Sequence, residues 1–166
     1  TRRLRARLER AGITLADRGG WALSTSRAAA TLDAWVSCIE ADFPTRALLA
    51  LLKSGFLPQG SALADALEPR AHAARIAGSA ARWREAMHSS EERQQWRTLE
   101  AAARPLAAAG QQPASAHLEQ LLHSLDAVGI SAGLAADLAG ARVLSRLHEL
   151  QEALAGTALN MQWRAF

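Results

Sequence analysis

The sequence predicts a mainly all-α fold, a multi-helix domain, and three observations lead to that expectation. Ala and Leu, two strong helix formers, account for 39 and 25 of the 166 residues. Residues that favour strands are scarce, with three Phe and no Tyr. Apolar residues recur every three or four positions along most of the chain, which is the helical period. A chain of this length suits one domain with its own core.

The first 23 residues carry the one credible strand signal. Residues 2–10 form a charged helical stretch with Leu4 and Leu8 on one face, followed by a glycine. Residues 13–15 alternate in the way that a short strand does, and residues 17–20 have the composition of a turn. We therefore expect at most one short strand pair, near the N-terminus.

Two helices are expected next. Ser24 or Thr25 can cap a helix that runs to about residue 40. Pro44 then suits the first turn of a helix over residues 45–54, and residues 58–61 have the composition of a loop. The buried stripe of the first of these helices should consist of Ala28, Leu32, Trp35, Val36 and Ile39.

In the middle of the chain, prolines predict where helices begin and end. A short helix over residues 61–67 should stop before Pro69, which can start a longer helix over about residues 70–87. Ser89 and Glu92 have the spacing of a capping box, which opens a helix that Pro105 kinks or ends.

Three further helical stretches are predicted in the last third of the chain. One covers residues 115–127, and the longest covers residues 131–155, with an interruption expected at Gly140. Asn160 should cap a last turn, whose apolar stripe comprises Leu159, Trp163 and Phe166.

Charge and cysteine content narrow the classes of function. The net charge is +3, and residues 1–20 alone carry six Arg against two acidic residues. A single Cys excludes an internal disulfide framework and favours a cytoplasmic location. No apolar run approaches 18 residues, so we expect no membrane partner.

Neither a catalytic residue nor a cofactor or metal site is expected in this chain. His148 and Glu152 share a helix face, but no third ligand lies nearby in the sequence, so a solvated pair is the simpler interpretation. Cys38 should behave as a small buried hydrophobe. The chain has no glycine-rich phosphate loop and no nucleophile elbow.

Tryptophans beside arginines suggest two opposite interpretations. Arg82, Trp83 and Arg84, followed by Arg93, Trp96 and Arg97, could form a platform on which single-stranded nucleic acid stacks. The helical period instead places the tryptophans with apolar neighbours, and we expect these four to lie in the core: Trp35, Trp83, Trp96 and Trp163.

The basic first helix is the better candidate for an electrostatic contact. Arg3, Arg7 and Arg10 share one face of residues 2–10, at i, i+4 and i+7. They are the predicted contacts to DNA phosphates, although a solvated surface helix would show the same pattern.

Two stretches resemble a known family. Residues 2–25, a basic helix followed by a glycine, a short strand and a turn, look like the segment after the fourth helicase motif of UvrD-like superfamily I helicases. Residues 48–57, LLALLKSGFL, resemble the LLxLLKSPFL run of AddB-type helicase–nuclease proteins, in the inferred exodeoxyribonuclease family. Gly55 stands where that run usually has Pro.

The resemblance implies an internal helical accessory subdomain of a bacterial DNA repair and recombination protein. Residues 1–23 would be the edge of the helicase-like core, residues 24–156 the accessory subdomain, and residues 157–166 the start of the return to the core. The subdomain would have no chemistry of its own. Its partners would be DNA, bound weakly and non-specifically, and the remaining helicase-like and nuclease domains. The alternative is a helical protein–protein adaptor unrelated to DNA.

Overall fold

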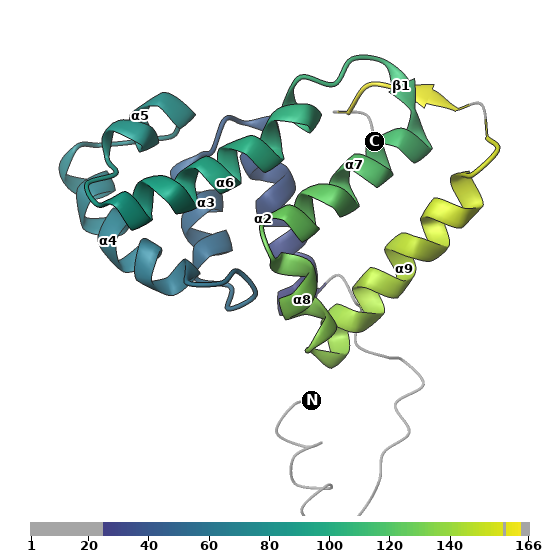
Figure 1. Cartoon of the computed structure of the whole chain (residues 1–166), viewed down its shortest axis with the longest axis horizontal. Coiled ribbons are helices and arrows are strands. Elements are labelled where there is room, and N and C mark those ends of the chain that lie inside the picture. The colour runs from purple at the N-terminus through teal and green to yellow at the C-terminus, as the bar shows by residue number, and fades with distance from the viewer. Residues whose placement is uncertain (1–24, 158, 164–166) are drawn as a thin grey trace, which may run out of the picture.

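The computed structural model describes residues 25–157 and 159–163, and this part of the chain is almost entirely helical (Figure 1). The predicted all-α class is confirmed. The elements in chain order are α2 (Arg27–Glu40), α3 (Thr45–Leu52), α4 (Gly60–Ala73), α5 (Ala80–Glu85), α6 (Ser90–Ala107), β1 (Gln112–Pro113), α7 (Ala114–Ala127), α8 (Ile130–Ala135), α9 (Leu138–Leu154) and β2 (Asn160–Met161). No helix in the described ranges is both long and apolar enough to cross a membrane.

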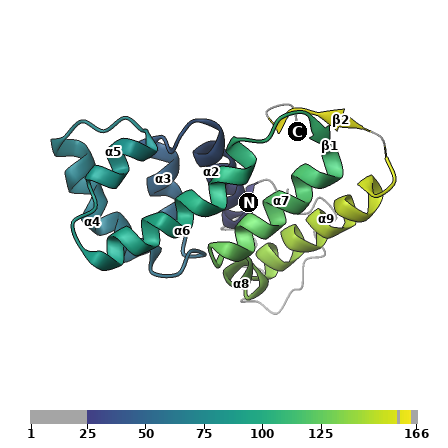
Figure 2. The ribbon, with the colours of Figure 1, turned by 45° about the horizontal axis from the view of Figure 1, so that its top comes forward.

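The helices form two groups joined by α2 and α6. Helices α3, α4 and α5 make one end of the body, and α7, α8 and α9 make the other (Figures 1 and 2). Helix α2 packs on α3, α6 and α9, so it touches both groups. The buried apolar side chains accordingly belong to one continuous core rather than to two.

All four tryptophans that were predicted to lie in the core are buried there, so that prediction is confirmed. The indole N–H of Trp35 donates to Ser124 Oγ at 2.9 Å, which ties α2 to α7. The indole N–H of Trp83 donates to the carbonyl oxygen of Phe43 at 2.8 Å. The arginines that flank Trp83 and Trp96 are therefore left on the surface without an exposed indole beside them.

Helix α2 begins two residues later than its first predicted cap. Ser26, not Ser24 or Thr25, is the N-cap, and its hydroxyl accepts a hydrogen bond from the N–H of Ala29 at 3.1 Å. The buried side of α2 is also wider than the predicted stripe, because the helix has neighbours on several sides. Thr31, Ala34 and Cys38 are buried as well, whereas Leu32 and Val36 are half-buried.

The boundary predicted at Pro69 is wrong. Helix α4 continues through Pro69 to Ala73, and the single helix expected over residues 70–87 is instead divided between the end of α4 and the short helix α5. Pro69 has no N–H to donate to the carbonyl of Asp65, four residues earlier. Both residues are exposed, so water can donate a hydrogen bond to that carbonyl instead. The chain then leaves the helix because residues 74–79 return along the start of α3, where the N–H of Thr45 donates to the carbonyl of Ala77 at 2.9 Å.

The loop expected over residues 58–61 is shorter than predicted, because Gly60 already begins α4. A Cβ at this position would lie 2.5 Å from the carbonyl oxygen of Leu52. Glycine is therefore the residue that lets the start of α4 approach the end of α3 this closely.

The predicted capping box at the start of α6 is confirmed. Ser89 Oγ accepts from the N–H of Glu92 at 3.1 Å, and the Glu92 carboxylate accepts from the N–H of Ser89 at 3.2 Å. The helix continues past Pro105, which is exposed, to Ala107. The interruption expected at Gly140 lies earlier, because Asp137 caps α9 by accepting from the N–H of Gly140 at 2.8 Å.

The last turn predicted from Asn160 is also wrong. Asn160 and Met161 form β2, which pairs antiparallel with β1 (Figure 2). The N–H of Ala114 donates to the carbonyl of Leu159 at 2.9 Å, and a ring nitrogen of His117 lies 2.8 Å from the carbonyl oxygen of Met161. These long-range bonds hold the segment extended. The strand expected at residues 13–15, and Phe166 of the predicted stripe, lie outside the described residues.

Candidate nucleic-acid interface

Three arginines share one exposed side of α6, which we call the α6 arginine face: Arg93, Arg97 and Arg104. Their spacing of i, i+4 and i+11 places them within about 40° of one another around the helix axis. At 1.5 Å per residue, they extend over about 16 Å of helix. Together they make a short line of positive charge.

Burial of the opposite side of α6 explains why these arginines face outward. The buried residues of the helix are Trp96, Leu99, Ala103 and Leu106. These apolar side chains lock the rotation of α6 about its own axis, because turning the helix would expose two large residues, Trp96 and Leu99. The direction in which the α6 arginine face points is therefore determined by the core.

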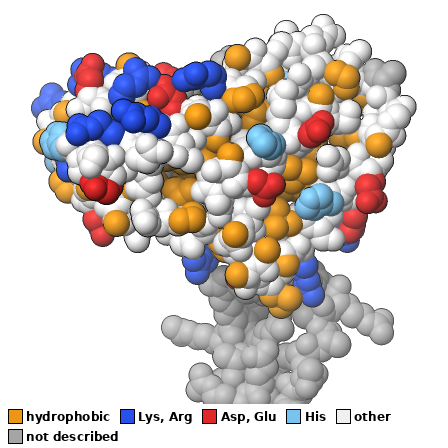
Figure 3. Space-filling view, in the orientation of Figure 1, with side chains coloured by type: hydrophobic (Ala, Val, Ile, Leu, Met, Phe, Trp, Pro, Cys, Tyr) orange, Lys and Arg blue, Asp and Glu red, His pale blue; other side chains and the backbone are white. Residues whose placement is uncertain are grey.

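The three arginines have no carboxylate partner among the described residues. Arg93 donates to the carbonyl oxygen of Met87 at 3.2 Å, which leaves its charge uncompensated. Glu100 lies on the same side of α6, but it forms an ion pair with Arg84 of α5 and is neutralised there. Figure 3 shows the result, with Lys and Arg side chains gathered over α5 and α6.

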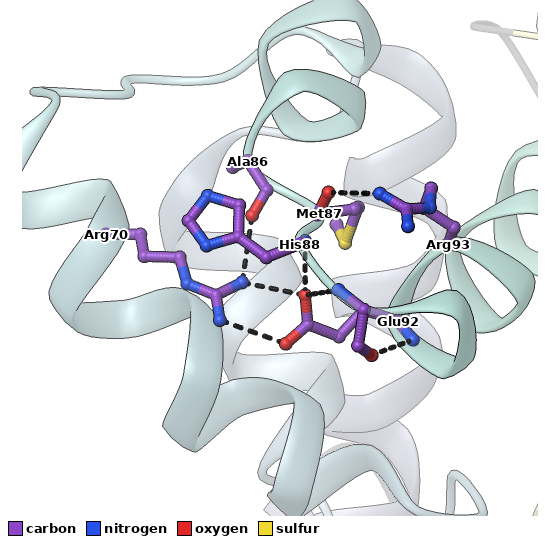
Figure 4. Close-up of polar contacts among 7 residues, drawn as sticks. Arg70, Ala86, Met87, His88, Glu92 and Arg93 are labelled. Atoms are coloured by element: carbon purple, nitrogen blue, oxygen red, sulfur yellow. Dashed lines mark hydrogen bonds and ion pairs between the residues drawn. The ribbon is translucent and has the colours of Figure 1, made fainter.

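A neighbouring arginine, Arg70, has a structural role instead. The Arg70 guanidinium holds Glu92 with two hydrogen bonds, of 2.7 and 3.0 Å, and donates to the carbonyl of Ala86 at 2.9 Å (Figure 4). The Glu92 carboxylate also accepts from the N–H of His88 and the N–H of Ser89. Arg70 above all, and then these backbone donors, lower the pKa of Glu92 to about 2. This cluster ties α4 to the start of α6 and so positions the α6 arginine face.

The chemistry that these arginines offer is phosphate binding without base stacking. A guanidinium matches a phosphate with two parallel hydrogen bonds, and its charge does not titrate in the physiological range. Stacking would require exposed rings, but the Trp and Phe side chains in the described part of the chain are buried. The α6 arginine face can therefore hold a nucleic-acid backbone but cannot distinguish base sequence by stacking.

The sequence-based candidates are distributed differently from the observed site. Arg3, Arg7 and Arg10 lie outside the described residues, so their contacts stay a prediction. The pattern of Trp next to Arg does identify Arg93 and Arg97, but for the wrong reason, since no indole is available. It misses Arg104, which the i+11 spacing from Arg93 could have identified.

The other chemically interesting residues have structural roles. Burial raises the pKa of the Cys38 thiol to about 12, which agrees with the predicted buried hydrophobe. His148 Nδ1 lies 2.9 Å from the carbonyl oxygen of Leu144 in its own helix. Within the described ranges, no three His, Cys, Asp or Glu side chains lie close enough together to hold a metal ion.

The buried histidine was not anticipated from the sequence. His117 is fully buried in α7, and its Nδ1 lies 2.8 Å from the side-chain amide of Gln112. With the contact to Met161, the ring bridges both strands of the small sheet. Gln112 lies only five residues away, but Met161 lies 44 residues away, so no local pattern could have indicated that the ring bridges the two strands.

Comparison of the chain with protein-family models, with curated proteins and with solved structures gives no match.

Proposed function

We propose that this chain is a non-catalytic helical subdomain of a bacterial DNA repair and recombination helicase–nuclease, and that it contacts the DNA backbone through the α6 arginine face. The observation that carries the proposal is the alignment of three arginines, none with a carboxylate partner among the described residues, on one exposed side of a helix. The resemblance of residues 2–57 to the AddB-type and UvrD-like proteins supports the class of parent protein. Such a role belongs in the cytoplasm.

The second resembling stretch, residues 48–57, supports a shared helical body rather than a shared binding site. Its apolar side chains are mostly buried, namely Leu48, Leu51, Leu52, Phe56 and Leu57. Gly55 has a φ of +83°, which a proline cannot adopt. The turn after α3 must therefore differ locally from that of a family member with Pro at this position.

The proposed contact is weak and independent of base sequence. Three arginines release only a few counterions from DNA, which corresponds to non-specific affinity in the micromolar range or weaker at physiological salt. Useful affinity would come from the parent protein, in which the helicase-like and nuclease domains bind the same DNA molecule and raise its local concentration.

The contact can be tested by fluorescence anisotropy with a labelled 30-base-pair duplex at low salt. Replacing Arg93, Arg97 and Arg104 together by Ala should weaken binding by about tenfold or more, because all three phosphate contacts are lost. A control variant replaces Arg46, Arg142 and Arg146, which are exposed on α3 and α9, and removes the same formal charge elsewhere. Of these three arginines, Arg146 forms an ion pair, with Glu149.

The control variant should retain most of the affinity. Its arginines make no phosphate contact in the proposed complex, and salt screens the effect of distant charges on the DNA. Equal affinities of the two triple variants would overturn the assignment of the contact to α6. A third variant, with Arg3, Arg7 and Arg10 replaced by Ala, shows whether residues 2–10 contribute as well. The gene of the parent protein should encode helicase and nuclease motifs around this segment, and the lack of both would contradict the proposed parent.

A further inference from the structure

A groove runs between α6 and α7 beside the α6 arginine face. Its volume is about 720 Å³, and it is open to solvent. The apolar part of its lining, which we call the alanine floor, consists of small or compact residues: Ala101, Ala102, Pro105 and Ala127. The side chains of Gln94, Thr98 and Gln120 add polar groups to the lining. On α6 the lining runs from Gln94 to Pro105, which corresponds to about 16 Å, or three helical turns.

The two sides of the groove carry opposite charge. Arg97 stands on the α6 side, with the rest of the α6 arginine face beyond it, whereas Glu119 and His123 stand on the α7 side. Neither Arg97 nor Glu119 has an ion-pair partner within the described ranges. In Figure 3, Lys and Arg side chains are most numerous over α5 and α6, where some acidic side chains lie among them, and His and acidic side chains lie over α7 and α9.

The lining favours a helical ligand over an extended one. The backbone groups of α6 and α7 are used inside these helices, so an extended peptide would find almost no partners for its own N–H and C=O groups. A helix satisfies its own backbone, and the alanine floor lets it approach to normal helix-packing distance. One backbone acceptor of α6 is available to such a helix, the carbonyl of Ala101, because Pro105 has no N–H to donate to it.

We propose that the α6–α7 groove docks an amphipathic helix of another protein, about three turns long. The helix would present an apolar stripe to the alanine floor, carboxylates along the edge next to Arg97, and Lys or Arg along the edge next to Glu119. A side-chain donor on its apolar stripe would reach the Ala101 carbonyl. This goes beyond the proposed function, because the ligand is a protein and not DNA.

A second copy of this chain does not offer such a helix within the described residues. Helix α9 has a stripe of half-buried or exposed leucines, Leu147, Leu150 and Leu154. Beside that stripe, however, Arg146 and Glu149 occupy the same edge and pair with each other. The edges of α9 are therefore not separated by charge, as the groove requires.

The test uses the full chain and two labelled 14-residue peptides with helix-favouring composition. In the matched peptide, a Leu and Ala stripe lies between one Glu edge and one Lys edge. The control peptide has the same composition and net charge, with Glu and Lys mixed on both edges. Fluorescence anisotropy should show the matched peptide binding at least tenfold more tightly than the control peptide.

Ala101→Trp fills the groove without changing its charge, and Ala62→Trp, at an exposed position of α4, is the matched control variant. Ala101→Trp should weaken binding of the matched peptide at least tenfold, and Ala62→Trp should leave it unchanged. Circular dichroism checks that both variants keep their helical content. Neither substitution removes an arginine, so the slope of log DNA affinity against log salt concentration should not change, and loss of peptide binding is separable from loss of the phosphate contacts.

Three results would overturn the proposal: no binding of the matched peptide up to about 1 mM, equal binding of the two peptides, or equal effects of the two Trp variants. A single-stranded oligonucleotide, dT15, tests the other macromolecule that could lie there. If Ala101→Trp weakens oligonucleotide binding and spares peptide binding, the groove belongs to the nucleic acid and the proposal is wrong.

Discussion

Removing the negative charge of Glu92 should destabilise the fold measurably, although this residue lies close to the surface. Its carboxylate joins Arg70 of α4 to the first turn of α6 and completes the capping box with Ser89 (Figure 4). Glu92→Gln keeps the size and an acceptor oxygen, so the amide can still accept from the backbone N–H groups. What is lost is the charge opposite the Arg70 guanidinium.

The size of the effect follows from the pKa of Glu92. A decrease from 4.5 to about 2 corresponds to at most about 3 kcal/mol of preference for the ionised carboxylate in the folded state. The side chains of Arg70 and Glu92 keep 27% and 14% of their surface exposed, so water screens part of this interaction. We therefore expect Glu92→Gln to lower the free energy of unfolding by about 2 kcal/mol at pH 7.

The assay is urea unfolding followed by circular dichroism, at pH values from 7 to 2. Because the folded-state pKa of Glu92 is lowered, its stabilisation is complete above about pH 4.5 and is lost as the pH falls towards 2. The difference between wild type and Glu92→Gln should therefore shrink over that window. Glu68→Gln, which removes the exposed partner of Lys53, should cost less than about 1 kcal/mol. Equal costs for the two variants, or a difference that does not depend on pH, would refute the reasoning.

Three further predictions concern other parts of the chain. Gly133→Ala should cost about 2 kcal/mol or more, because the new Cβ would lie 2.5 Å from the carbonyl oxygen of Phe56, whereas Gly110→Ala meets nothing within 4 Å and should be neutral; urea midpoints compare the two. Cys38 should react with a thiol reagent only after unfolding, since it is buried and its pKa is about 12; fast reaction of the native protein would contradict this. The purified chain should neither hydrolyse ATP nor cut DNA, as the sequence has no phosphate-binding loop; turnover that co-purifies with the chain through successive columns would contradict it.

Features encoded by neighbouring residues could be predicted from the sequence. The capping box of Ser89 and Glu92 and the burial of the four tryptophans depend on spacings of three or four residues, and both are present in the structure. The helix over residues 115–127 was predicted to within one residue, since α7 covers Ala114–Ala127. Local periodicity is enough for such elements because each one buries a single continuous stripe.

Features that depend on distant residues could not be predicted. Pro69 reads as a helix boundary, but its exposure lets α4 pass through it, and exposure is a property of the whole fold. The pairing of β1 with β2 joins residues 112–113 to residues 160–161, which no local pattern connects. The burial of His117 agrees with its place on the buried stripe of α7 beside Leu118 and Leu121, but its contact with Met161 of β2 could not be predicted, for the same reason.

Only part of the candidate interface could be predicted from the sequence. Arg93 and Arg97 stood out beside Trp96, but only the rotation of α6, set by Trp96 and Leu99 in the core, shows that Arg104 belongs to the same exposed side. The neutralisation of Glu100 by Arg84, which lies 16 residues away on another helix, could not be read from spacing either. The number of uncompensated charges on a surface thus depends on which ion pairs the fold creates.

The central claim is that the α6 arginine face contacts DNA phosphates, and the salt dependence of binding tests it most directly. The slope of log affinity against log salt concentration, measured with duplex DNA, counts the phosphates that the protein neutralises, at about 0.9 per contact. Replacing Arg93, Arg97 and Arg104 by Ala should reduce the magnitude of that slope by about 2.7. The control variant lacking Arg46, Arg142 and Arg146 should keep the wild-type slope. An unchanged slope in the α6 variant, or the same reduction in both variants, would contradict the claim.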